Sequence, residues 1–164
     1  MDQRLATLFE QCFYQHYQTR CLGGADEPLY QPADANGIAC LRYRQDFPAS
    51  ALHEISHWCL AGKRRLQLPD FGFSYAAAPR SLCAQVEFLG FEVRPQALES
   101  LFCRAVGLPF RCSFDDLEDR FMALRPGFEA AVASAELNFI RAGLPPRGGQ
   151  FLQALRRANH VGMA

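Results

Sequence analysis

His53, Glu54 and His57 form an H-E-x-x-H sequence, and these residue types at this spacing can carry out metal chemistry. Histidines four residues apart lie on one face of a helix, one turn apart, so their ring nitrogens can bind one metal ion. The glutamate beside the first histidine can act on a water molecule bound to that ion. We therefore predict His53 and His57 as metal ligands and Glu54 as a catalytic residue.

Two histidines do not complete such a site, because zinc or iron needs at least a third protein ligand and an open position. Downstream acids are the candidates. Glu87 and Glu92 follow His57 by 30 and 35 residues (87 − 57 and 92 − 57), Glu99 lies further along, and Asp70 is a weaker candidate in the intervening loop. Spacing alone does not choose between them.

The same ligands support three kinds of protein. With Zn²⁺, Glu54 would act as a general base and the protein would be a hydrolase, by default a peptidase. With Fe²⁺, two histidines and one carboxylate form a facial triad that activates O₂. A third alternative is a non-catalytic adaptor in which the metal is structural. Motif and spacing by themselves favour the zinc peptidase.

The motif has to be presented by a helix, and its neighbours predict one. Pro48 suits the first helical turn, where its missing N–H costs nothing, and Gly62 is typical of the position just past a helix end. We expect the helix to run from about Pro48 to Ala61. Residues at three- and four-residue steps form its core-facing stripe: Leu52, Ile55, Ser56, Cys59 and Leu60.

The rest of the chain predicts an α+β fold, a mostly helical single domain over residues 1–164 with a small β-sheet. Extended segments are expected at 28–31 and 38–43, joined through the hairpin signal Asn36-Gly37, and a further strand at 71–75. Further helices are expected at 2–17, 80–93, 95–106, 113–121, 126–142 and 146–158. Pro95 predicts a kink or break between two of them.

Composition limits the functional classes. The chain has 164 residues, 49% of them hydrophobic, with 17 basic and 17 acidic residues. The balanced charge argues against nucleic acid as a partner, and no apolar run is long enough to cross a membrane. The N-terminal residues lack the pattern of a signal peptide, and the seven cysteines form no C-x-x-C pair. We expect free thiols and a cytoplasmic protein.

Longer stretches of the sequence are more specific than H-E-x-x-H alone. The segments 51–62 (ALHEISHWCLAG) and 91–98 (FEVRPQAL) resemble the bacterial elongation factor P hydroxylase family. Further matching stretches are 27–34 (EPLYQPAD) and 107–110 (GLPF). The resemblance covers nearly the whole chain.

The resemblance implies a metal-dependent hydroxylase, with iron as the expected metal and O₂ as co-substrate. Its substrate and protein partner would be elongation factor P, on which it would hydroxylate one modified lysine. The fold implied is similar to zinc-metalloprotease-like domains. His53 and His57 are the implied ligands, together with Glu92, which lies in the FEVRPQAL stretch. Zinc could occupy the same ligands in a purified sample, and a zinc metallopeptidase with these ligands is the alternative.

Overall fold

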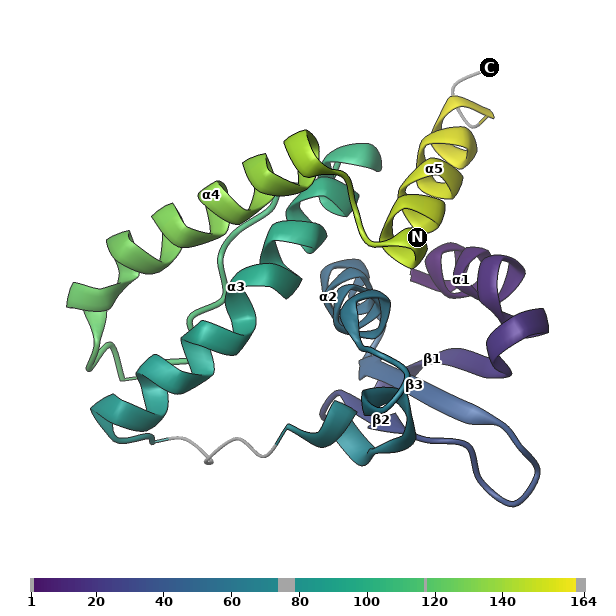
Figure 1. Ribbon diagram of the computed structural model, residues 1–164, viewed down its shortest axis with the longest axis horizontal. Helices are drawn as coiled ribbons and strands as arrows, with labels where there is room; N and C mark the ends of the chain where they lie inside the picture. The colour runs from purple at the N-terminus through teal and green to yellow at the C-terminus, as the bar shows by residue number, and fades with distance from the viewer. Residues whose placement is uncertain (1, 74–78, 117, 162–164) are drawn as a thin grey trace.

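The computed structural model describes residues 2–73, 79–116 and 118–161 (Figure 1). Three strands and two helices make up the first part of the chain: α1 (Asp2–Tyr17), β1 (Thr19–Ala25), β2 (Leu29–Gln31), β3 (Ala39–Arg44) and α2 (Pro48–Leu60). Two short 3-10 helices follow, η1 (Arg65–Gln67) and η2 (Pro69–Gly72). The remainder is helical: α3 (Leu82–Ala105), η3 (Met122–Leu124), α4 (Arg125–Ala142) and α5 (Pro146–Val161). The predicted α+β class, mostly helical with a small sheet, is confirmed.

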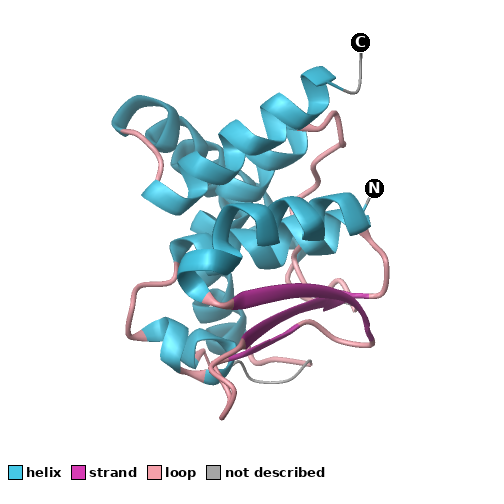
Figure 2. Cartoon of the chain, turned by 90° about the vertical axis from the view of Figure 1, so that its right-hand side faces the viewer, coloured by secondary structure: helices cyan, strands magenta, loops and turns pink. Residues whose placement is uncertain are grey.

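The sheet has the strand order β1-β3-β2. β2 and β3 are antiparallel, with Tyr30 opposite Leu41, as the Asn36-Gly37 turn predicts. β1 pairs in parallel with the other edge of β3, with Cys21 opposite Leu41. β1 was not among the predicted strands, because it contains the pair Gly23-Gly24, which is typical of a break between elements. Helices α1 and α2 pack on the sheet, and Figure 2 shows the helices gathered above it.

The motif helix α2 lies between the sheet and α3, in the middle of the molecule (Figure 1). Its bounds agree with the predicted helix, and Pro48 occupies its first turn. Trp58 is fully buried and packs against Phe9 and Phe13 of α1, with ring centroids 4.8 Å away in each case. Removal of so large a buried side chain costs about 3–5 kcal/mol, so this contact fixes the rotation of α2.

The predicted division into helices at 80–93 and 95–106 is wrong, because α3 is one helix of 24 residues that contains Pro95. The kink that was predicted as the alternative to a break stays a prediction. A proline inside a helix removes one hydrogen bond and costs about 3 kcal/mol. The turns that follow are buried on several sides, with Leu98 and Phe102 fully inaccessible, and this burial offsets the cost. Ser81, rather than a residue further upstream, caps the helix by accepting a hydrogen bond from the backbone N–H of Ala84.

Two other predicted elements differ from the structure. The expected helix at 113–121 is a loop over its described residues, because buried side chains of α3 hydrogen-bond its backbone and Asp115 has a φ of 46°. A strand was expected at 71–75, but the first two of these residues belong to the 3-10 helix η2. Asp70 and Phe71 both have a left-handed backbone, which is incompatible with a strand. Residues 74 and 75 lie outside the described part of the chain.

All seven cysteines are free, as predicted. Among the helices in the described ranges, none is both long enough and apolar enough to cross a lipid bilayer.

Candidate metal centre

His53 and His57 are presented on the side of α2 that faces α3. Their rings are in contact, with centroids 4.8 Å apart, and the two Nε2 atoms are 3.2 Å apart. The end of α2 is held from outside by Arg147 of α5, whose guanidinium donates a hydrogen bond to the carbonyl of Ala61 and lies 4.4 Å from the Trp58 ring. These contacts hold the end of the helix that carries both imidazoles.

Glu92 of α3 completes the cluster, and its side chain is buried. Its Oε1 lies 3.2 Å from His57 Nε2, and its Oε2 lies 3.4 Å from His53 Nε2. One donor atom from each of the three residues lies within 4.8 Å of the others. The structure thus brings together the two predicted histidines and the carboxylate that the resemblance selected.

The spacing of these atoms fits a bound metal. Zinc–nitrogen and zinc–oxygen bonds of about 2.0–2.1 Å, arranged tetrahedrally, place donor atoms about 3.3 Å apart. The three nitrogen and oxygen separations are 3.2, 3.2 and 3.4 Å. Two imidazoles and one carboxylate also suit iron, with positions left for other ligands. In the part of the chain that the structure describes, this is the only cluster of three such side chains close enough to hold one ion.

Glu99, which was a candidate third metal ligand in the sequence, lies outside the cluster and contacts the far side of the His53 ring. Its Oε2 lies 2.8 Å from His53 Nδ1, on the side of the ring that faces away from the cluster. A carboxylate at this distance accepts the Nδ1 proton, so the lone pair of the neutral imidazole is on Nε2 and points at the cluster. Glu99 therefore orients the ring of His53, a candidate ligand, and the sequence did not predict this role.

The remaining candidates for the third ligand lie elsewhere. Glu87 is exposed on α3. Asp70 accepts a hydrogen bond of 2.8 Å from the backbone N–H of Tyr30, so its carboxylate is used to attach η2 to the edge of β2. The helical phase of α3 explains the choice, because residues 92, 96 and 99 lie on one face while residue 87 lies on another.

His53 and Glu92 shift each other's pKa values in opposite directions. Burial lowers the pKa of His53, but Glu92 and Glu99 outweigh burial and raise it to about 10. Burial raises the pKa of Glu92, but His57 and His53 outweigh it and bring the pKa to about 2. The carboxylates that hold a proton on His53 would also stabilise a bound dication, which would take the place of that proton.

Glu54 lies beside the cluster without belonging to it. Burial raises the pKa of its carboxyl group, the two histidines lower it, and Glu92 and Asp70 raise it further, so that the net shift is upward. No hydrogen bond or ion pair joins Glu54 to another described side chain. Its carboxylate is available for a substrate or for a proton.

Aromatic side chains surround the cluster on the η2 side. The Phe71 ring is parallel to that of His57 at 6.3 Å, and the Phe73 ring is 6.4 Å from His57. Phe91 of α3 packs on Phe73 at 5.0 Å. Arg65 holds this wall, because it donates a hydrogen bond to the Phe71 carbonyl and lies 4.1 Å above the Phe73 ring. No sequence pattern predicted this wall.

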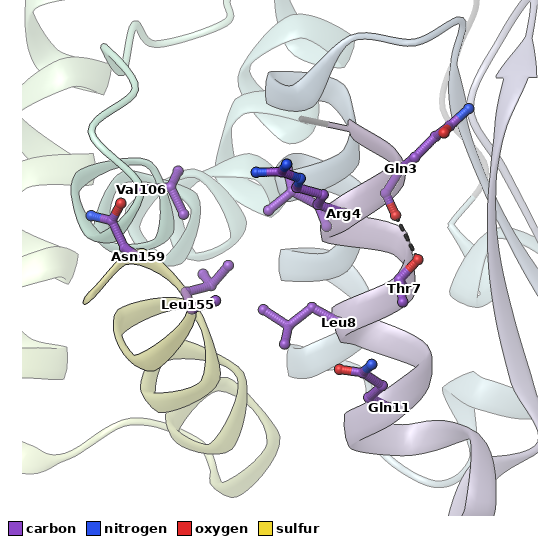
Figure 3. A pocket seen from close by; sticks show the side chains of 10 residues that line it. Gln3, Arg4, Thr7, Leu8, Gln11, Val106, Leu155 and Asn159 are labelled. Carbon is purple, nitrogen blue, oxygen red and sulfur yellow. Dashed lines mark hydrogen bonds between the residues drawn. The ribbon is translucent and has the colours of Figure 1, made fainter. Parts of the chain in front are cut away.

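A hollow lies between α1, α5 and the residue that follows α3, and none of its described lining residues belongs to the cluster (Figure 3). It has a volume of about 730 Å³ and is mostly apolar, with Leu8 and Leu155 facing each other across it. Among the described residues that line it, Arg4 is the only charged one. The residues that the structure describes around it include no group of donors that could bind a metal, and we do not assign the chemistry to it.

The fold and the site define a small α+β protein with an H-E-x-x-H helix and a candidate metal centre built by two helices. Residues 8–163 match the model of the elongation factor P hydroxylase family. The chain is also 39% identical over 152 residues to the elongation factor P lysine hydroxylase of Haemophilus influenzae, an alignment that covers 92% of this chain and 85% of the relative. The chain belongs to the elongation factor P hydroxylase family.

Proposed function

We propose that this protein is a metal-dependent enzyme that hydroxylates the modified lysine of translation elongation factor P. Family membership supports the reaction and the substrate. The observation that carries the proposal is the convergence of His53, His57 and Glu92 within 4.8 Å on the motif helix of such a chain. The family match favours this activity over the zinc peptidase, which would use the same ligands.

In this proposal His53, His57 and Glu92 hold the metal, and Fe(II) is the working ion. Iron held by two histidines and one carboxylate would supply O₂ activation, with O₂ as co-substrate. One oxygen atom would go to the lysine, and a two-electron reductant from outside this chain would reduce the other to water. Zinc fits the same donor atoms, so it can occupy the site in a purified sample. Glu99 keeps the Nε2 lone pair of His53 directed at the site throughout.

Glu54 and the aromatic wall would receive the substrate. A lysine derivative presents an alkyl chain and ammonium groups. Phe73 and Phe91 offer apolar surface for the alkyl chain and exclude water from the site. Glu54, whose carboxyl group neither orients a ligand nor belongs to the cluster, would bind an ammonium group, and Asp70 nearby adds negative charge. A bound cation would favour the ionised form of Glu54.

The protein partner in this proposal is elongation factor P itself, and the enzyme would act in the cytoplasm, where translation factors work. Neither nucleic acid nor a membrane is needed for the reaction. The balanced net charge of the chain is consistent with local docking of a protein, since no global field attracts a polyanion.

The test is intact-mass spectrometry of elongation factor P from cells with and without this protein. We expect the factor from the deficient cells to lack the mass of one oxygen atom, and complementation with the wild-type chain to restore it. An unchanged mass, in cells where the factor carries its other lysine modification, would contradict the proposal. In that case a search for cleaved proteins would test the zinc peptidase.

A further inference from the structure

Gln96 lies one helical turn after Glu92 on α3, and only 1% of its surface is accessible. Its Nε2 donates a hydrogen bond of 3.2 Å to Glu92 Oε2 and another of 2.8 Å to the carbonyl of Ser113. Its Oε1 accepts a hydrogen bond of 3.0 Å from the backbone N–H of Ser113. Both ends of the amide are therefore used, in a place where an unpaired amide would be costly.

These contacts determine which way the amide points. In the reverse orientation the amide oxygen would face the Glu92 carboxylate, and the amide nitrogen would face the Ser113 N–H. Both contacts would be repulsive, because the first would pair two acceptors and the second would pair two donors. The backbone of Ser113 thus holds Gln96 with its N–H directed at Glu92, and this hydrogen bond is charge-assisted because Glu92 is ionised.

We propose that Gln96 is a positioning residue, which holds the Glu92 carboxylate in the geometry that binds the metal and ties it to the loop at Ser113. The inference rests on the proposed function, in which Glu92 is a ligand. Outer partners of metal ligands orient them, and their loss typically weakens metal binding about 10- to 100-fold. Gln96 would orient Glu92 by a hydrogen bond, as Glu99 orients His53 by a hydrogen bond.

Gln85 is a matched control on the same helix. It is equally buried, at 1%, and its Nε2 donates a hydrogen bond of 2.7 Å to the carbonyl of Phe114, the residue after Ser113. It anchors the same loop, but among the described residues no hydrogen bond joins it to His53, His57 or Glu92. A purely structural role for Gln96 predicts equal effects of the two substitutions on metal binding.

The experiment compares Gln96→Leu with Gln85→Leu in the full chain, using Co²⁺ as the probe metal. Its dissociation constant is measured by competition with a chelator, and its visible absorption spectrum reports the ligand geometry. We expect Gln96→Leu to weaken Co²⁺ binding about 10- to 100-fold and to change the spectrum. Gln85→Leu should stay within about twofold of the wild type, although it destabilises the fold. Equal losses in the two variants would overturn the proposal.

A second measurement uses the unmodified protein and does not depend on the folding of a variant. If Gln96 joins the loop to the metal ligand, metal binding should slow hydrogen exchange at the Ser113 amide, which donates to Gln96. The Ile38 amide, bonded to Asp34 in the hairpin turn, is the reference and should not change. Unchanged protection at Ser113 would overturn the proposal. A wild-type chain that binds no metal would instead contradict the proposed function.

Discussion

The metal centre and the hollow between α1 and α5 differ in nearly every property. The hollow has a volume of about 730 Å³ and is mostly apolar, and Arg4 is the one charged residue among its described lining residues. The metal centre is compact and is built from charged groups that α2 and α3 present to each other. By size and apolarity alone, the hollow would be the default binding site. By the chemistry of its donor atoms, the cluster of His53, His57 and Glu92 is the candidate site.

The difference shows that converging donor atoms, and not empty volume, identify the reactive region. The Nε2 atoms of His53 and His57 are 3.2 Å apart, and a buried carboxylate faces both of them. Such an arrangement brings polar groups out of water, and a bound metal would compensate the cost. The hollow is mostly apolar, so its lining does not bring a comparable set of charged groups together.

The largest effect is expected when a ligand is removed. His53→Ala should lower metal affinity by more than about 100-fold and abolish hydroxylation of elongation factor P, because it removes a donor outright. The fold should remain, since His53 is not part of the packed core. Metal content after purification and the mass of the factor provide the measurement, with His16→Ala on α1 as the control. A fully active His53→Ala enzyme would contradict the assignment.

The next effect separates catalysis from metal binding. Glu54→Gln keeps the shape of the side chain but removes its charge, so we expect kcat/KM for elongation factor P to fall about 10- to 100-fold, within the range of charge-assisted contacts. Metal affinity should stay within about twofold of the wild type. Steady-state kinetics and metal competition test this together. A parallel loss of metal would mean that Glu54 acts as a ligand.

Substitution of Glu99 is expected to cause a loss of similar size to that at Glu54, but in metal affinity. Glu99→Leu removes the acceptor of the His53 Nδ1 proton, so metal affinity should fall about 10- to 100-fold. Glu87→Leu, which changes an exposed acid on the same helix, should leave metal affinity unchanged. Chelator competition on the two variants is the measurement. Equal affinities would refute the orienting role of Glu99.

Metal removal tests whether the centre is structural. Metal at 100 times its dissociation constant stabilises the folded state by about 2.7 kcal/mol, so chelation should lower the Tm by about 5–10 °C. The helices should remain, because Trp58, Phe9 and Phe13 hold α2 independently of the cluster. Circular dichroism with and without a chelator provides the readout. Unfolding at room temperature would favour the structural-adaptor alternative.

The smallest effect is expected in the hollow. Leu8→Ser places a hydroxyl on its lining, far from the donors on α2 and α3, and should leave kcat/KM and metal affinity within about twofold of the wild type. The same kinetic and chelator assays apply. A loss of activity at constant metal content would show that the hollow takes part in recognition of the substrate, and the contrast between the two regions would have to be revised.

The sequence by itself determined the motif helix and its chemistry. The H-E-x-x-H spacing, Pro48 in the first turn and the apolar stripe all act within one helix, and local rules describe them well. The hairpin at Asn36-Gly37 followed from the same kind of local signal. The family resemblance, carried by the segments 51–62 and 91–98, supplied the choice of Glu92 and the expected substrate.

Only the tertiary structure decided what surrounds the ligands. In the sequence nothing local distinguishes three residues of α3 from ordinary polar residues: Glu92, Gln96 and Glu99. Their contacts form only when α3 packs against α2 and the loop at Ser113 packs against α3. The continuity of α3 through Pro95 depended on burial from several sides, which no local preference reports. The contact of Gln96 with Ser113 joins residues 17 positions apart, and that of Glu99 with His53 joins residues 46 positions apart. Their energy exists only when both partners are brought out of water together.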